Sequence, residues 1–148
     1  MAGHVWMSGT MLMAGLGIPV MAAMSGALGK HIGTPGAALV LFSGALCCAL
    51  AATALSGGFS VGALKAAPGY TLMSGIFVAF YVLTITMIGP RIGIGNAVFL
   101  VLLGQMLSSA LIDYFGAFSA APVALSPSRL LGLALMTAGV MLAQRPEN

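Results

Sequence analysis

The sequence predicts an all-α integral membrane protein with about five transmembrane helices. Of its 148 residues, 60% are hydrophobic and only 5% are charged, whereas a soluble domain carries roughly 25% charged residues. A chain with so few charges cannot cover a surface that faces water. Its apolar residues form continuous runs of the length that a spanning helix needs, about 20 residues. They do not alternate with polar residues as in a β-barrel.

The first span is expected at residues 5–28. Trp6 begins it at the depth where aromatic rings anchor a helix to the membrane interface. Pro19 lies inside the run and removes one backbone hydrogen bond, so together with Gly15 and Gly17 it predicts a helix kink. No Lys or Arg precedes the run, which argues against a cleaved signal peptide.

The second span is expected at residues 35–55, with Thr34 as its N-cap. Gly44 and Cys48 recur at four-residue spacing on this helix, and small residues at this spacing let helices approach closely in lipid. Cys47 and Cys48 are adjacent in an apolar run and do not form a disulfide framework. We expect both thiols to be reduced and packed.

The remaining spans are expected at residues 69–89, 94–115 and 127–143. Pro90 is expected to end the third span, and Ser126 to cap the fifth. Because no linker or internal repeat is apparent, residues 1–148 are interpreted as a single transmembrane domain.

The basic residues are almost evenly divided between the two sides of the membrane. With five spans, Lys65 and Arg129 share one side, and Lys30, Arg91 and Arg145 share the other. The positive-inside rule then gives almost no instruction on orientation. The chain either has one orientation set by other signals, or inserts both ways and pairs as an antiparallel dimer. The dimer, of two copies or of the chain with a homologue, would form a ten-helix inverted-repeat transporter, of which this chain is half.

Two polar faces are candidates for the wall of a substrate pathway. Gln105 lies near the centre of the fourth span, and a buried amide is costly unless it is hydrogen-bonded. The residues that share a helical face with Gln105 are Ser108 and Ser109. The second face centres on Tyr81 in the third span, with Ser74 and Thr84. Both faces could equally serve helix packing.

Asp113 is the only carboxylate within or near a span. It either forms an interfacial pair with Arg129 or Lys65, or acts in proton coupling or as a gate. No carboxylate lies at mid-span, so a cationic substrate would lack a counter-charge there. We therefore hypothesise a neutral or weakly polar substrate, or an anion held by helix N-termini near Gly-rich breaks.

Flexible and small side chains point to two further features. Met21 and Met24, close to the expected kink, could line an adaptable pocket. The fifth span carries a set of small residues that predicts a close-packing or dimer face: Gly132, Ala134, Ala138 and Gly139.

Several functional classes are disfavoured. No basic patch suits nucleic acid, and we identify no nucleophile–base pair, metal-ligand cluster or phosphate loop. We therefore expect no enzyme and no cofactor. The partners expected are membrane lipid, a second copy or homologue, and a small-molecule substrate. A small dual-topology ion channel and a non-transporting membrane subunit remain alternatives, although the chain has few charges with which to line a pore.

The second half of the chain resembles the YdcZ-type family of inner-membrane exporters, in the drug/metabolite transporter superfamily. The resemblance rests on "YVLTITMIGPRIGIGNAVFLVLLGQMLSSALIDYFG" and "LSPSRLLGLALMTAGVMLAQRP". It is most specific at Gly104-Gln105, at Ile112-Asp113 before Gly116, and at Arg129 before Gly132. The resemblance implies five spans per chain, relatives with ten spans, transport, and location in the bacterial inner membrane.

The first half, "GIPVMAAMSGALGKHIGTP", is similar to the family's first span and turn. Where the family often has a Gln and, four residues later, an Asn, this chain has Met21 and Ser25. The resemblance places these two residues in the substrate pathway, but without the amides.

Overall fold

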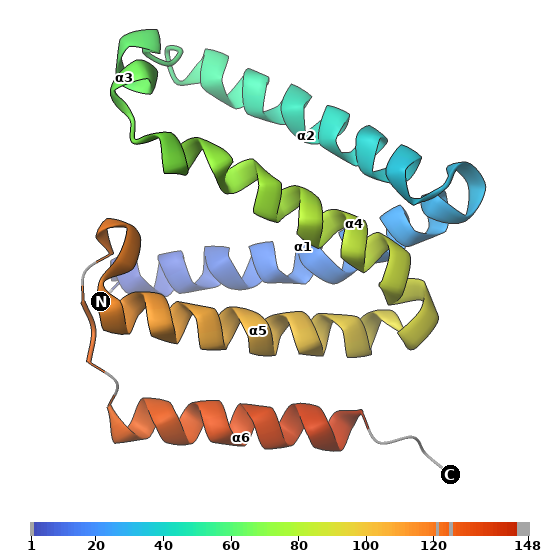
Figure 1. Cartoon of the computed structure of the whole chain (residues 1–148), viewed down its shortest axis with the longest axis vertical. Helices are drawn as coiled ribbons and strands as arrows, with labels where there is room; N and C mark the ends of the chain where they lie inside the picture. Colours follow the sequence, from blue (N-terminus) through green and yellow to red (C-terminus); the bar gives the residue numbers. More distant parts are fainter. Residues whose placement is uncertain (1, 121, 125, 145–148) are drawn as a thin grey trace. The chain divides into compact units, whose positions relative to one another are not determined.

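A computed structural model of the chain describes residues 2–120, 122–124 and 126–144. Within these residues, every regular element is a helix (Figure 1). The long helices are α1 (Ala2–Ile32), α2 (Thr34–Leu55), α4 (Ser74–Ile92), α5 (Ile94–Phe115) and α6 (Pro127–Ala143). The short ones are α3 (Val61–Ala66), η1 (Gly69–Met73) and η2 (Ala117–Ser119).

The prediction of an all-α membrane protein with about five spans is confirmed. Four helical segments of the described chain are long and apolar enough to cross a bilayer, and α6 is a shorter apolar helix. The four segments are Val5–Ile32, Thr34–Leu55, Gly69–Ile92 and Ile94–Phe115.

The chain divides into two compact units, residues 1–92 and 93–148. In the first unit α1, α2 and α4 all pack against one another. The buried residues of this unit gather in the second half of α1, the start of α2 and the second half of α4: Ala22, Ser25, Gly26, Ala37, Ala38, Val82, Ile85, Thr86 and Gly89. The three helices therefore converge at one end, while their other halves are exposed.

Two glycines allow the close approach of α1 and α4. A Cβ atom added to Gly26 would lie 2.8 Å from Pro90 Cγ, and one added to Gly29 would lie 3.3 Å from Thr86 Cγ2. A larger side chain at Gly26 would therefore push α4 away, because atoms do not pack at such distances. Pro90 lies inside α4, which continues to Ile92, so the expectation that Pro90 ends the helix is wrong. A proline removes only its own N–H donor, and here the helix is already in its last turn.

A single glycine joins α1 to α2, and another joins α4 to α5. Gly33 has φ 81° and ψ 157°, and Gly93 has φ 90° and ψ 137°, a region open almost only to glycine. Each carbonyl accepts the first bond of the next helix, from the N–H of Ala37 or Ala97, at 3.0 Å. Gly33, not Thr34, thus occupies the N-cap position of α2, so that expectation is wrong. A chain that reverses over one residue needs a backbone that Thr does not adopt.

These two turns also share sequence at a constant offset. Gly29, Ile32, Gly33 and Ala37 recur as Gly89, Ile92, Gly93 and Ala97. Both turns are followed by 22-residue helices. The two turns therefore use the same residue types in the same backbone geometry.

In the second unit α5 and α6 lie side by side (Figure 1). Helix α5 ends at Phe115, and the C-cap residue Gly116 has a φ of 60°, the left-handed conformation that favours glycine. The connection then returns to the end of α5, where the Val123 N–H donates to the Asp113 carbonyl at 2.9 Å. Ser126 caps α6, accepting a bond from the Arg129 N–H at 3.2 Å, which confirms its expected role.

Candidate functional site

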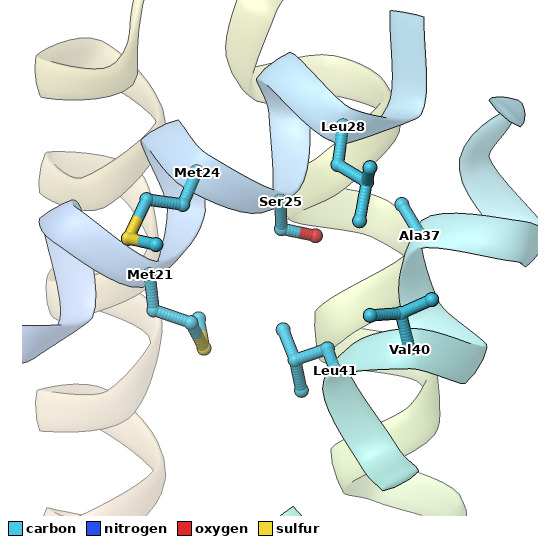
Figure 2. Close-up of a pocket in the computed structure, with 7 residues that line it drawn as sticks. All are labelled: Met21, Met24, Ser25, Leu28, Ala37, Val40 and Leu41. Carbon is cyan, nitrogen blue, oxygen red and sulfur yellow. The ribbon is translucent and has the colours of Figure 1, made fainter. Parts of the chain in front are cut away.

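A cavity of about 470 Å³ lies between α1 and α2 (Figure 2). This volume is within the range of small-molecule sites, roughly 300–1,000 Å³. Residues Met21, Met24, Ser25 and Leu28 of α1 and Ala37, Val40 and Leu41 of α2 line it. The structure thus brings together the two methionines expected to form a pocket and the Ser25 of the expected substrate pathway.

Ser25 connects the cavity to α4. Its hydroxyl lies 2.6 Å from that of Thr86, and this hydrogen bond is buried. The close approach at Gly26 and Gly29 brings α4 near enough for these short side chains to meet. Pro90 also leaves the Thr86 carbonyl without its usual i+4 donor, because proline has no N–H.

The lining carries no charged side chain, and its one side-chain hydroxyl is that of Ser25. Within the described residues, no group of three or more His, Cys, Asp or Glu side chains could hold a metal ion. The chemistry available in the cavity is therefore apolar contact plus hydrogen bonding at one point.

The second polar face does not line the cavity. Tyr81 is half-buried, and its hydroxyl is buried with no hydrogen-bond partner among the described residues. Ser74, the first residue of α4, is exposed, and Thr84 is half-buried. A buried hydroxyl without a partner costs free energy, so Tyr81 has unused capacity to bind a water or a ligand.

The polar face of α5 divides into two parts. Gln105 and Ser108 are exposed. Ser109 is half-buried and donates to the Met106 carbonyl of its own helix at 3.0 Å. The Ser109 hydroxyl thus has its hydrogen-bond partner within α5, whereas the Gln105 side chain is exposed on the second unit.

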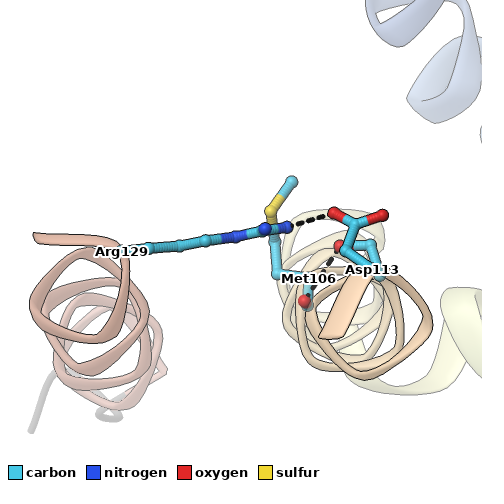
Figure 3. A network of polar contacts seen from close by, with 4 residues as sticks. Met106, Asp113 and Arg129 are labelled. Atoms are coloured by element: carbon cyan, nitrogen blue, oxygen red, sulfur yellow. Dashed lines mark hydrogen bonds and ion pairs between the residues drawn. The ribbon is translucent and has the colours of Figure 1, made fainter. Parts of the chain in front are cut away.

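Asp113 pairs with Arg129, one of the two partners considered from the sequence. The carboxylate Oδ2 lies 2.5 Å from Nη2 of the guanidinium (Figure 3). This charge-assisted bond connects the end of α5 to the start of α6. Both side chains are about one-third exposed, so the pair lies in a partly solvated position and contributes only modestly to stability.

The expected packing faces are open in this chain. A Cβ added at Gly44, Gly132 or Gly139 would meet nothing within 4 Å. The other members of these faces, Cys48, Ala134 and Ala138, are exposed. Cys47 and Cys48 are free, but the expectation that they are packed is wrong, since both lie on the exposed part of α2.

The three residues expected to form a kink lie in α1, which is continuous through them. Pro19 is half-buried, while Gly15 and Gly17 are exposed. Because Pro19 has no N–H, the Gly15 carbonyl four residues earlier has no partner at that position.

Sequence reasoning missed Thr86 and the α2 wall of the cavity. Thr86 lies within the expected third span, but its role depends on a contact with Ser25 of α1, which is far away in the sequence. The available signal was its spacing: Val82, Thr86 and Gly89 repeat at the intervals of one helical face, and all three are buried.

Comparison with protein families matches residues 6–142 to the family described as "Putative inner membrane exporter, YdcZ". Separate comparisons with curated proteins and with solved structures gave no match. A family of exporters is a family of transport proteins, not of enzymes, and the apolar helices fit a multi-pass protein of the inner membrane. The match covers nearly the whole chain, and the protein therefore belongs to the YdcZ family of inner membrane exporters.

Proposed function

We propose that the protein exports small neutral molecules, working as an antiparallel dimer by alternating access. The observation that carries the proposal is the cavity between α1 and α2, of ligand size and without charge, in a member of an exporter family. The substrate would bind between Met21 and Ser25 on one helix and Leu41 on the other.

The lining determines the charge of the substrate in this proposal. An ion moved from water into an apolar site loses its hydration, and this costs several kcal/mol or more unless a counter-charge is present. The cavity offers only thioether, aliphatic and hydroxyl groups. A neutral molecule therefore fits it better than a cation or an anion.

The exposed polar and small residues support a dimer. Gln105 lies in the apolar helix α5 and is exposed in the second unit, so in a bilayer its amide needs a partner from outside that unit, which a second chain would supply. Gly132 and Gly139 leave open space on α6, where a helix of a second chain could approach closely. A second copy, or a homologue, would cover both surfaces.

The almost even division of the basic residues between the two expected sides of the membrane supports a partner in the opposite orientation. Lys65 lies at the end of α3, whereas Lys30 and Arg91 lie in the last turns of α1 and α4. Arg145, which was counted with Lys30 and Arg91, lies outside the described residues. In the proposal, Asp113 and Arg129 form a gate contact that rearranges when the site changes sides.

Counterflow in liposomes tests this proposal. Three probes share a phenyl group: 1-phenylethane-1,2-diol is neutral, phenylphosphonate is anionic and phenyltrimethylammonium is cationic. We expect saturable counterflow of the diol through reconstituted protein, well above that of protein-free liposomes, and none of the two ions. Saturable flux of the cation alone would contradict a neutral substrate, and a linear, diffusion-like flux of the ions would favour a channel.

A further inference from the structure

We infer that the cavity binds a molecule with an apolar body and one hydroxyl or carbonyl group, and that Ser25 forms the hydrogen bond to that group. This inference rests on the proposed function and names the substrate class of the same site. The observations behind it are the composition of the cavity wall and the unusual bonding of one pair of hydroxyls.

The wall of the cavity is matched to an apolar body. Figure 2 shows the Ser25 side chain projecting from α1 towards α2, among the aliphatic side chains of Leu28, Val40 and Leu41. Met21 and Met24 complete the α1 side, and flexible thioethers adapt to the shape of different ligands. A ligand with two hydroxyls, such as the diol, could bond to a side chain of this wall through only one of them.

Ser25 and Thr86 form a hydroxyl pair that joins two helices, whereas most hydroxyls of the described helices bond locally. In an apolar helix a Ser or Thr hydroxyl commonly donates to a carbonyl one turn earlier. Seven hydroxyls of the described residues do so: Thr10, Ser43, Thr53, Ser56, Thr71, Ser109 and Thr137. Ser25 and Thr86 instead bond to each other, between α1 and α4.

This pairing leaves the Ser25 hydroxyl with either its proton or a lone pair available for a ligand. Either hydroxyl can be the donor of the pair. When Thr86 donates, the Ser25 proton is free for a ligand carbonyl; when Ser25 donates, its remaining lone pair can accept from a ligand hydroxyl. Both residues are about 95% buried or more, so water does not compete strongly for this function. One serine thus accommodates both kinds of ligand group without any charge.

A protection assay tests the inference. Met21→Cys is introduced with Cys47→Ala and Cys48→Ala, and its alkylation by N-ethylmaleimide is measured in nanodiscs. The probes are 1-naphthol and 1-methylnaphthalene, which have nearly the same shape, since the hydroxyl of the first is replaced by a methyl group in the second. We expect 1-naphthol to protect the cysteine at a concentration about fivefold lower than 1-methylnaphthalene, the preference that one neutral hydrogen bond gives.

Matched variants assign that preference to Ser25. Ser25→Ala is expected to remove it, and Thr86→Val, which keeps the shape of threonine, is expected to reduce it by leaving Ser25 free to bond within α1. Thr86→Ser keeps both hydroxyls and should retain the preference, which controls for misfolding. Ser43→Ala, which removes a hydroxyl bonded within α2, should also retain it.

The outcomes separate this inference from the proposed function. Equal protection by both probes in the unsubstituted background, or a preference that survives Ser25→Ala, would overturn the role of Ser25 while leaving export intact. Failure of both probes to protect, together with normal counterflow of the diol, would overturn the inference alone. Failure of both probes and of counterflow would overturn the inference and the proposed function together.

Discussion

The hydroxyls of Ser25 and Thr86 lie 2.6 Å apart where α1 packs against α4, and their hydrogen bond is buried. The bond is possible because glycine at positions 26 and 29 lets the two helices approach. Small residues thus set the helix spacing, the spacing lets the two hydroxyls meet, and the pair ends at the wall of an apolar cavity.

The close approach at Gly26 is expected to be sensitive to a single methyl group. In Gly26→Ala the new Cβ would lie 2.8 Å from Pro90 Cγ, and overpacking of this kind costs about 1–3 kcal/mol. Gly9→Ala is the control, because its Cβ would meet nothing within 4 Å and alanine favours helices over glycine by roughly 1 kcal/mol. Thermal unfolding in detergent should show a lower midpoint for Gly26→Ala than for Gly9→Ala. Equal midpoints would mean that the helices do not meet there.

The glycine turns should behave as a pair. Gly33→Ala and Gly93→Ala place a Cβ at φ values of 81° and 90°, and residues in such strained regions cost about 1–3 kcal/mol each. Gly95→Ala, in the first turn of α5 with open space around its Cβ, should be neutral or stabilising. Unfolding in detergent measures all three, and a tolerated alanine at either turn would contradict the geometry described here.

The fold was more predictable than the site. Continuous apolar runs determine the number and rough position of the helices, because a spanning helix must bury an apolar surface about 20 residues long. Met21 and Met24 could be selected from the sequence as flexible side chains near a proline, whereas Ser25 was indicated only by the family resemblance. Thr86 could not, because its role depends on a contact between helices that are far apart in the sequence. The turn at Gly33 was misassigned because a Thr-Pro pair also suits an ordinary helix start.

The Asp113–Arg129 pair is expected to act as one unit. Because both side chains are about one-third exposed, each of Asp113→Asn and Arg129→Gln should cost roughly 0.2–1 kcal/mol of stability. The double variant should cost no more than the larger single effect, which a double-mutant cycle in detergent measures. Additive costs would show that the two groups do not interact. If the pair forms a gate, both single variants should also slow diol counterflow to a similar extent, whereas loss in Asp113→Asn alone would indicate proton coupling.

Gln105 is expected to contribute to association between chains. Gln105→Leu removes an exposed amide from α5, so it should lower energy transfer between donor- and acceptor-labelled chains mixed in nanodiscs. Met106→Leu, a change between exposed apolar residues on the same helix, should leave the energy transfer unchanged. Unchanged or stronger association in Gln105→Leu would mean that the amide faces lipid or a ligand pathway and not a partner.

The most direct test of the antiparallel dimer is the orientation of the chain in the membrane. Single cysteines at His31, beside the turn between α1 and α2, and at Phe59, between α2 and α3, are placed in a Cys47→Ala, Cys48→Ala background and labelled on intact cells with an impermeant maleimide. The two positions lie at opposite ends of α2, so a chain that inserts both ways should label partially at both, with the two labelled fractions adding to about one. Complete labelling at one position and none at the other would contradict the homodimer, and an oppositely oriented homologue would then be needed as the partner.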